Sequence, residues 1–562
     1  NVPEDQAMST FTLADVEALR RLARVFDAES AVRKAAALAD LASRAPADAE
    51  TLVAYHDSLL FLLAHPQTPA LHAACDAELS RCADLSEQAA ARDEPPPDAL
   101  HGAGLPGARL AVTFNLQVTR WLHRRFPRAT GLNAVRGDVG ALRRILSETL
   151  PAIEFETLAS GEEDAQDYLA ELGADRASDR LGWLLAQIEA LAVPEGLRRK
   201  LYNDLDAFVR IESSRDGLSR TTLRGLDRPI FFHEAPLARR EDARGILDAP
   251  LGEAIALDAA GRDKLLTAAR GLLALLGRHT APISDCDGEG VSASAPGRAG
   301  AIALFPATPE NRPPLDSHIG MMLFKNGLPV AYGGGWPYLA ACKIGINIFE
   351  PYRGGESHFF FLSVLRAYRW LFGVERFIVE RYQFGRNNPE GIASGAYWFY
   401  YRLGFRSMRR ALDDLATSEW ARISAEPGYA TPRETLIEFT QTHMELRLPG
   451  CPDSYDYADP ADVSRAVTAA IRDRFDGDRA AFAQWMRARL ADALPGAETR
   501  APRAFADLGP AFALIDDLPG WSADERESVV RLLEAKEAAD ERPYFRMLTE
   551  NEKLAQALAR IG

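Results

Sequence analysis

The chain has 562 residues, of which 47% are hydrophobic and 26% are charged, and its formal net charge at pH 7 is −15. This length exceeds what a single hydrophobic core serves, so we expect three or four domains. The acidic balance argues against nucleic acid as the main partner. Five scattered cysteines and the lack of a long apolar run predict a cytoplasmic protein with no metal site and no membrane partner.

Residues 9–215 read as one helix after another. Thr12 and Asp15 have the spacing of a capping box, and apolar residues then recur at helical intervals. Further helices are predicted at 30–44, 49–64, 68–91, 109–125, 137–149, 163–172, 176–192 and 195–211. We therefore predict a helical domain over 9–215, in which no motif indicates a ligand.

Strand patterns begin near residue 225. The predicted elements are strands at 227–236 and 252–259, a helix at 260–277, and strands at 300–308, 318–327 and 328–339. Asn326 and Gly327 lie between the last two strands, and Asn-Gly accepts the positive φ angles of a tight hairpin turn. The sequence therefore predicts an antiparallel hairpin centred on these two residues.

The most informative segment is 343–405. Its elements are a strand, a glycine-rich turn, a buried helix, a second strand and an aromatic helix, predicted at 344–349, 350–357, 358–373, 374–380 and 393–405. A strand followed by such a turn and a helix directs backbone N–H groups at the helix start, where a phosphate can bind.

Helical patterns return beyond residue 410. The segment 411–460 is mixed, with 435–448 predicted as a strand or strand pair. Helices are predicted at 460–474, 478–494, 523–541 and 550–562. We assign 411–562 to a mostly helical C-terminal domain.

The phrase INIFEPYRGG (346–355), the strand VERFIVE (374–380) and YRLGF (401–405) together resemble the GNAT superfamily of N-acyltransferases. The resemblance extends over about residues 318–405. It implies a GNAT-like mixed α/β domain at 225–410, with its core at 260–410, within an α+β multi-domain chain. The implied activity is transfer of an acyl group from a thioester to an amine.

The resemblance also implies a donor site. In GNAT proteins the turn after the fourth strand holds the CoA pyrophosphate, and backbone N–H groups of that strand polarise the thioester carbonyl. The matching positions are Ile346, Ile348, Arg353, Gly354, Gly355 and Ser357. The alternative is a tight turn in which Ser357 caps the helix and Glu356 interacts with the helix dipole.

Three side chains are the predicted catalytic residues. The resemblance places Tyr400 where the family often has the acid that protonates the leaving thiolate. Glu350 ends the fourth strand and can accept the amine proton, and His358, with His318 as a rival, is an alternative base. The alternatives are that Tyr400 packs the core, Glu350 is solvated and the histidines are structural.

The donor remains open between acetyl-CoA or another acyl-CoA and an acyl carrier protein. Glu356 and His358 stand where the family pattern has glycines, and a carboxylate aimed at a pyrophosphate would repel it. The acceptor is an amine on a small molecule or on a protein. The GGGWP segment (333–337) is either a bulge that opens the acceptor groove or a plain loop.

A non-catalytic function is the competing hypothesis. In that case the GNAT-like fold is a scaffold or sensor that binds a protein partner through its helical domains. The turn distinguishes the two hypotheses. An open groove at the turn favours the enzyme, and a groove filled by the Glu356 carboxylate favours the scaffold.

Overall fold

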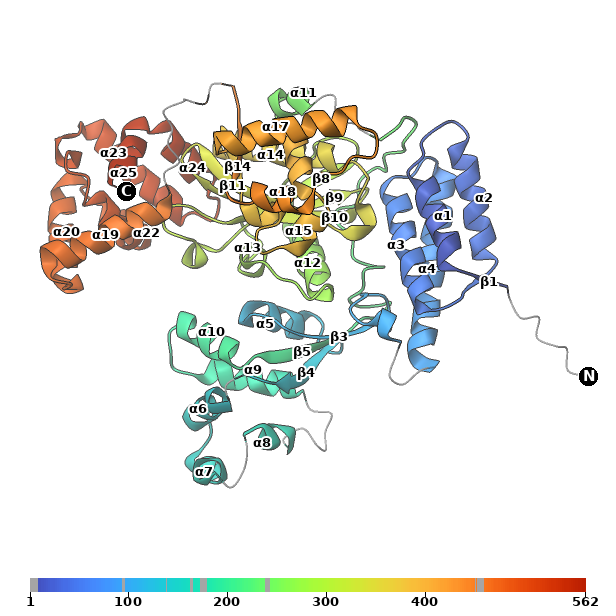
Figure 1. Cartoon of the computed structure of the whole chain (residues 1–562). Coiled ribbons are helices and arrows are strands. Elements are labelled where there is room, and N and C mark those ends of the chain that lie inside the picture. The colour runs from blue at the N-terminus through green and yellow to red at the C-terminus, as the bar shows by residue number, and fades with distance from the viewer. Residues whose placement is uncertain are drawn as a thin grey trace, which may run out of the picture.

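The computed structural model describes residues 9–92, 97–137, 139–161, 165–171, 179–237, 243–449, 451 and 459–561. Helices and strands are mixed, as the α+β class requires. A nine-stranded sheet occupies the centre, with one helical bundle at either end and a smaller α/β module below it (Figure 1). Within these described ranges, no helix has the length and apolar character to cross a membrane.

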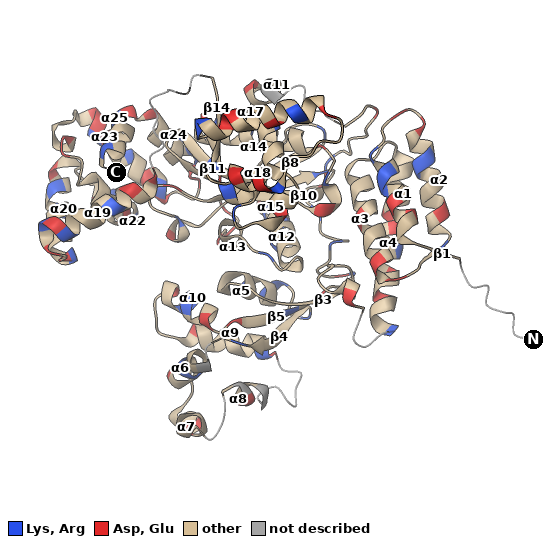
Figure 2. Cartoon of the chain, viewed as in Figure 1, with Lys and Arg blue, Asp and Glu red and all other residues tan. Residues whose placement is uncertain are grey.

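The N-terminal bundle contains four helices, α1 (Leu13–Ala23), α2 (Ser30–Ala42), α3 (Ala49–Ala64) and α4 (Pro69–Arg92). A short parallel pair, β1 (Thr10–Phe11) with β2 (Ala45–Pro46), holds the segment before α1 against the segment between α2 and α3. The predicted capping box is confirmed, because the Thr12 N–H donates to the Asp15 carboxylate at 2.8 Å. Figure 2 shows acidic and basic residues interspersed along both bundles, as is usual for solvent-facing helices.

The prediction of a helical domain over 9–215 is wrong for residues 109–212, which contain a small sheet as well as helices. β3 (Arg109–Thr113), β4 (Thr130–Val135) and β5 (Ala207–Glu212) form an antiparallel sheet in the order β3-β5-β4. Two of the predicted helices, 109–125 and 195–211, are each part strand and part helix in the structure. The helices of this module are α5 (Leu116–Arg125), α6 (Val139–Thr149), α7 (Ala152–Ser160), α8 (Ala165–Glu171), α9 (Arg180–Ala190) and α10 (Glu195–Asp204).

The central sheet has the order β13-β14-β12-β11-β10-β9-β8-β7-β6. The predicted hairpin is confirmed, with φ of 48° at Asn326 and 76° at Gly327. The predicted strand at 227–236 is wrong, since that segment is irregular. The first six strands in chain order are β6 (Ala254–Ile255), β7 (Ser292–Ser294), β8 (Gly300–Pro306), β9 (Ile319–Lys325), β10 (Leu328–Tyr338) and β11 (Ala341–Ile348).

Helices cover both faces of this sheet. On β10, a Cβ at Gly334 would point to the His318 ring, and Gly320, which pairs with Gly334, faces Pro282 and Ile283 of α13 (Ala281–Ser284). A Cβ at Gly335 would instead meet Tyr368 of α14 (Ser357–Phe372). Because side chains alternate along a strand, α14 lies on one face, and α13, preceded by α12 (Ala259–Leu275), lies on the other.

β11 and β12 (Arg376–Val379) separate after a short parallel contact. Ala341 to Lys343 pair with Arg376 to Ile378, whereas the rest of β11 pairs only with β10. The two strands therefore leave a gap at the carboxyl end of β11, and the turn at 353–356 and the start of α14 follow directly after it.

The predicted domain boundary at residue 410 is wrong, because the central sheet continues beyond it. β14 (Met444–Arg447) pairs with β12, and β13 (Arg406–Ser407) pairs with β14. α17 (Arg410–Ala425) and α18 (Arg433–Phe439) connect these strands. Within the predicted strand region at 435–448, only Met444–Arg447 is a strand, and the first residues of that region belong to α18.

The C-terminal bundle begins at α19. It comprises α19 (Pro460–Phe475), α20 (Arg479–Ala493), α21 (Ala497–Arg500), α22 (Pro502–Phe512), α23 (Ala523–Glu537), α24 (Arg542–Glu550) and α25 (Glu552–Ile561). The buried Arg312 ties it to the central domain by donating to the Ala539 carbonyl at 2.7 Å.

Candidate functional site

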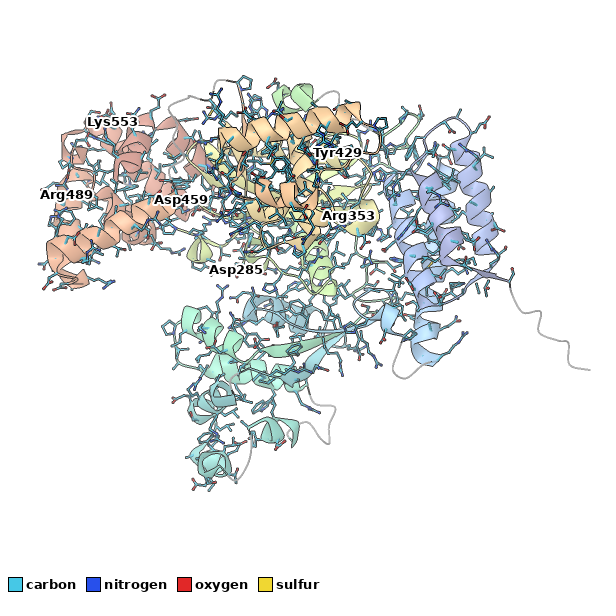
Figure 3. All side chains as sticks on the ribbon, viewed as in Figure 1. Asp285, Arg353, Tyr429, Asp459, Arg489 and Lys553 are labelled. Carbon is cyan, nitrogen blue, oxygen red and sulfur yellow. The ribbon has the colours of Figure 1, made fainter. Side chains whose placement is uncertain are left out.

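A cavity of about 1720 Å³ opens at the gap between β11 and β12. It is lined by the end of α1, the loop after α12, the residue before β9, strands β10 and β11, and the turn at 353–356. The short elements η5 (Arg381–Phe384), α15 (Pro389–Ala393) and α16 (Ala396–Arg402) complete the lining. In Figure 3 the labelled Arg353 lies on the side of the central domain that faces the N-terminal bundle.

All of the predicted site residues except Glu350 line this cavity, namely Ile346, Ile348, Arg353, Gly354, Gly355, Ser357, His358 and Tyr400. The rival base His318 lines it too. Glu350 instead begins the 3-10 turn η4 (Glu350–Tyr352), where it is exposed and outside the lining. We therefore withdraw the prediction of Glu350 as the base, because the turn directs its side chain to solvent.

The free edge of β11 carries backbone groups for an oxyanion. The Phe349 N–H donates to the Val330 carbonyl of β10 at 3.1 Å. Because successive residues of a strand direct these groups to opposite sides, the N–H groups of Ile346 and Ile348 face the gap. Arg353 lies on that same side, since its Nε donates to the Ile348 carbonyl at 3.4 Å. Such N–H groups can stabilise charge that develops on a carbonyl oxygen.

The turn is shaped by two glycines and by the N-terminal bundle. Gly354 has φ of 82°, a conformation that favours glycine. At Gly355 an added Cβ would lie 2.9 Å from the His65 ring at the end of α3. Arg24, at the end of α1, donates to the Arg353 carbonyl at 3.1 Å. The bundle therefore packs directly on the turn and places a second guanidinium beside it.

The Glu356 carboxylate does not occupy the cavity. Its side chain is fully buried on the other side of the turn, 2.5 Å from Arg298 Nη2 and 3.2 Å from Lys325 Nζ. Glu356 is absent from the cavity lining, whereas its neighbours Gly355 and Ser357 are part of it. The carboxylate is thus neutralised inside the protein and leaves the groove open.

Two histidines complete this buried cluster. His233 Nε2 lies 3.9 Å from the Glu356 carboxylate, and the His65 and His233 rings lie 5.4 Å apart. Burial, reinforced by the charge of Lys325, lowers the pKa of His65 to about 4 and that of His233 to about 3. Burial also lowers the pKa of Lys325, to about 8. Both imidazoles are therefore neutral at neutral pH.

We expect this cluster to make the fold sensitive to acid. Between pH 6.5 and 4 the unfolded chain binds protons at His65 and His233 that the native protein does not, so stability falls as the pH falls through that window. The loss is at most roughly 3 kcal/mol for His65 alone. The melting temperature should drop across this range, and His65→Gln should show a shallower drop. Parallel profiles for the two proteins would contradict this.

Tyr400 combines burial with access to the cavity. It is 3% exposed, and its ring makes edge contacts with Phe361 and Phe405. Burial raises the pKa of Tyr400 well above its usual range, so the phenol stays protonated at neutral pH. Among the described residues none hydrogen-bonds its hydroxyl. The neighbouring Tyr401, in contrast, contacts Thr417 Oγ1 at 3.3 Å and has a structural role.

The other end of the cavity lies on the α13 face of the sheet. Tyr332, Gly334 and Trp336 alternate on β10 and therefore share that face. The His318 ring stacks on Trp336 with centroids 3.7 Å apart, and burial lowers the pKa of His318 to about 4. Arg278, in the loop after α12, donates to the Tyr332 hydroxyl at 3.5 Å.

The glycine run at 333–335 is neither a loop nor a bulge. Gly333, Gly334 and Gly335 pair in register with β11, and the irregularity of β10 lies between Pro329 and Ala331 instead. Gly334 instead leaves room for the His318 ring, because an added Cβ there would lie 2.5 Å from His318 Nε2.

Sequence reasoning missed Arg24 and Arg278 as lining residues. Each comes from outside the turn and its helix, and no spacing in the sequence links them to it. Comparison with protein-family models, with curated proteins and with solved structures found no match to this chain.

Proposed function

We propose that this protein is a GNAT-like N-acyltransferase that moves an acyl group from a thioester to an amine. The observation that carries the proposal is the cavity at the gap between β11 and β12. It brings the glycine turn, the free N–H groups of β11 and the Tyr400 phenol together along one open space. Such an arrangement suits a thioester whose carbonyl lies in the gap.

The reaction needs three contributions from these residues. The amine nitrogen attacks the thioester carbonyl while the N–H groups of Ile346 and Ile348 stabilise the oxyanion. The C–S bond then breaks, and Tyr400 donates its proton to the leaving thiolate, giving an amide and a free thiol. The amine loses its proton to His318 or, through a cavity water, to solvent, since His318 is neutral at neutral pH.

Acyl-CoA is the donor that the turn suits best. Glu356 is turned away, and Arg24 and Arg353 both lie beside the start of α14, whose first N–H groups can bind phosphate oxygens. Two guanidinium groups match the several phosphates of CoA better than the single phosphate of an acyl carrier protein.

A thermal-shift titration with acetyl-CoA, longer acyl-CoAs and free CoA tests this function. Selective binding should raise the melting temperature of the central domain in proportion to the logarithm of ligand concentration, by roughly 2–4 °C for each kcal/mol of binding when that domain unfolds as one unit. Arg353→Ala and Arg24→Ala should each reduce the shift, because each removes a charge-assisted contact to phosphate. Arg410→Ala, which removes an exposed arginine outside the cavity, is the matched control and should leave the shift unchanged.

The titration also separates the competing hypotheses. A shift given only by phosphopantetheine or by an acylated carrier protein would replace CoA as the donor. No shift with any thioester or thiol ligand would contradict the acyltransferase and support the scaffold or sensor.

A further inference from the structure

In the described lining, ion-paired side chains lie at one end of the cavity but not at the other. Its two lining carboxylates are both ion-paired, Asp27 with Arg33 at 2.8 Å and Glu390 with Arg353 at 2.7 Å. Both pairs lie at the end of the cavity near the turn, which we assign to the donor. Within the described part of the chain, no carboxylate lies within ion-pair distance of Arg278 at the opposite end.

Arg278 is an exposed residue at the rim of this end of the cavity. The His318 ring covers Gly334, and Tyr332 and Trp336 lie two residues to either side of Gly334 on the same face. His318 lies against Trp336, and Gly345 pairs with Gly334 on the neighbouring strand β11. A small molecule at this end of the cavity would therefore contact Arg278 on one side and lie next to the gap-facing edge of β11 on the other.

We propose that the acyl acceptor is an amino acid, whose carboxylate binds Arg278 while its α-amine points to the thioester carbonyl at β11. This inference rests on the proposed function and names the substrate class of the same site. The guanidinium offers paired donors that match a carboxylate. The Tyr332 ring and the stacked His318 and Trp336 rings offer apolar surface for the side chain of the amino acid.

The same charges argue against basic acceptors. A polyamine or an aminoglycoside carries several ammonium groups, and each needs a carboxylate or an aromatic face when it leaves water. The described lining of this end has aromatic rings but no carboxylate, and Arg278 beside those rings repels a cation. The overall charge of −15 therefore does not predict the charge of the ligand.

The test compares matched amines with one fixed acyl-CoA, following release of the free thiol. Phenylalanine and leucine are the amino acids. Phenylalaninamide has a less basic amine than phenylalanine, and phenethylamine has a more basic one, so together they control for basicity. Spermidine represents the basic acceptors. We expect kcat/KM for the amino acids to exceed that for both carboxylate-free amines by at least roughly 10-fold, the scale of a charged hydrogen bond.

Arg278→Ala should raise KM for the amino acids by roughly 10- to 100-fold and leave the carboxylate-free amines and the acyl-CoA shift unchanged. Arg278→Lys should restore part of the preference. Lys264→Ala removes a positive charge from α12 outside the cavity, where Lys264 pairs with Asp227, and should behave as the wild type.

Several results would overturn the inference while the acyltransferase stands. These are equal or better turnover of phenylalaninamide, phenethylamine or spermidine, acylation restricted to protein amines, and an Arg278→Ala variant with unchanged amino acid KM. If no amine is acylated, thermal shifts with phenylalanine and phenylalaninamide decide. A larger shift with phenylalanine that Arg278→Ala abolishes supports the amino acid site and contradicts only the acyl transfer. Equal shifts with the two ligands contradict the amino acid site.

Discussion

Replacing Glu356 with alanine will destabilise the native protein by about 3–5 kcal/mol, the usual cost of removing one partner from a buried ion pair. Lys325 has no exposed side-chain surface, and Glu356 lies 3.2 Å from its ammonium group. Without the carboxylate, Lys325 and Arg298 face each other's charge in an apolar setting beside Phe231. Urea unfolding of the full chain measures the change.

Glu390→Ala is the matched control for this experiment. Glu390 also forms an ion pair with an arginine of the turn, Arg353, at 2.7 Å, but both side chains are about half exposed or more. Exposed pairs contribute about 0–1 kcal/mol, so this variant should unfold close to the wild type. Similar small losses in both variants would show that the Glu356 cluster does not stabilise the fold.

Tyr400→Phe will lower kcat for acyl transfer by roughly 10²-fold, the lower range for loss of a general acid. Tyr400 lines the cavity, and its hydroxyl carries a proton that phenylalanine lacks. The donor shift should be preserved, because the hydroxyl acts after the donor has bound. Initial rates of thiol release give kcat directly.

Tyr401→Phe is the control for this substitution. Tyr401 follows Tyr400 on α16 and is similarly buried, but its hydroxyl contacts Thr417 instead of the cavity. Its removal should change stability slightly and leave kcat within about twofold. An unchanged rate in a folded Tyr400→Phe protein would rule out the acid role.

Much of the central sheet was predictable because its signals are local. The Asn326-Gly327 turn follows from the φ angles that these residues tolerate, and β9 to β11 follow from apolar patterns that short turns interrupt. The β3-β5-β4 sheet was missed because β3 and β5 directly adjoin helices. A stretch of sequence that contains both a strand and a helix shows neither the two-residue period of a strand nor the 3.6-residue period of a helix clearly.

The site residues also divide into those with a local sequence signal and those placed by tertiary packing. The turn and Tyr400 were predicted because they belong to one continuous motif. The direction of Glu356 was not, since Lys325 and Arg298 come from β9 and the loop before β8. Glu350 was assigned wrongly because one residue decides whether a side chain belongs to a strand end or to the 3-10 turn that follows. Arg24 and Arg278 depend on tertiary packing alone.

The contact between Gly355 and His65 bears on how this protein can evolve. The ring of His65, from the N-terminal bundle, leaves no space for a Cβ at Gly355, and the Asn326 amide of the central hairpin donates to the Ala64 carbonyl at 2.9 Å. The bundle is therefore not a module that can be exchanged freely between proteins. A lineage that lost it would release Gly355 from constraint and expose the charges around Glu356, so the two parts should be inherited together and diverge at matched positions.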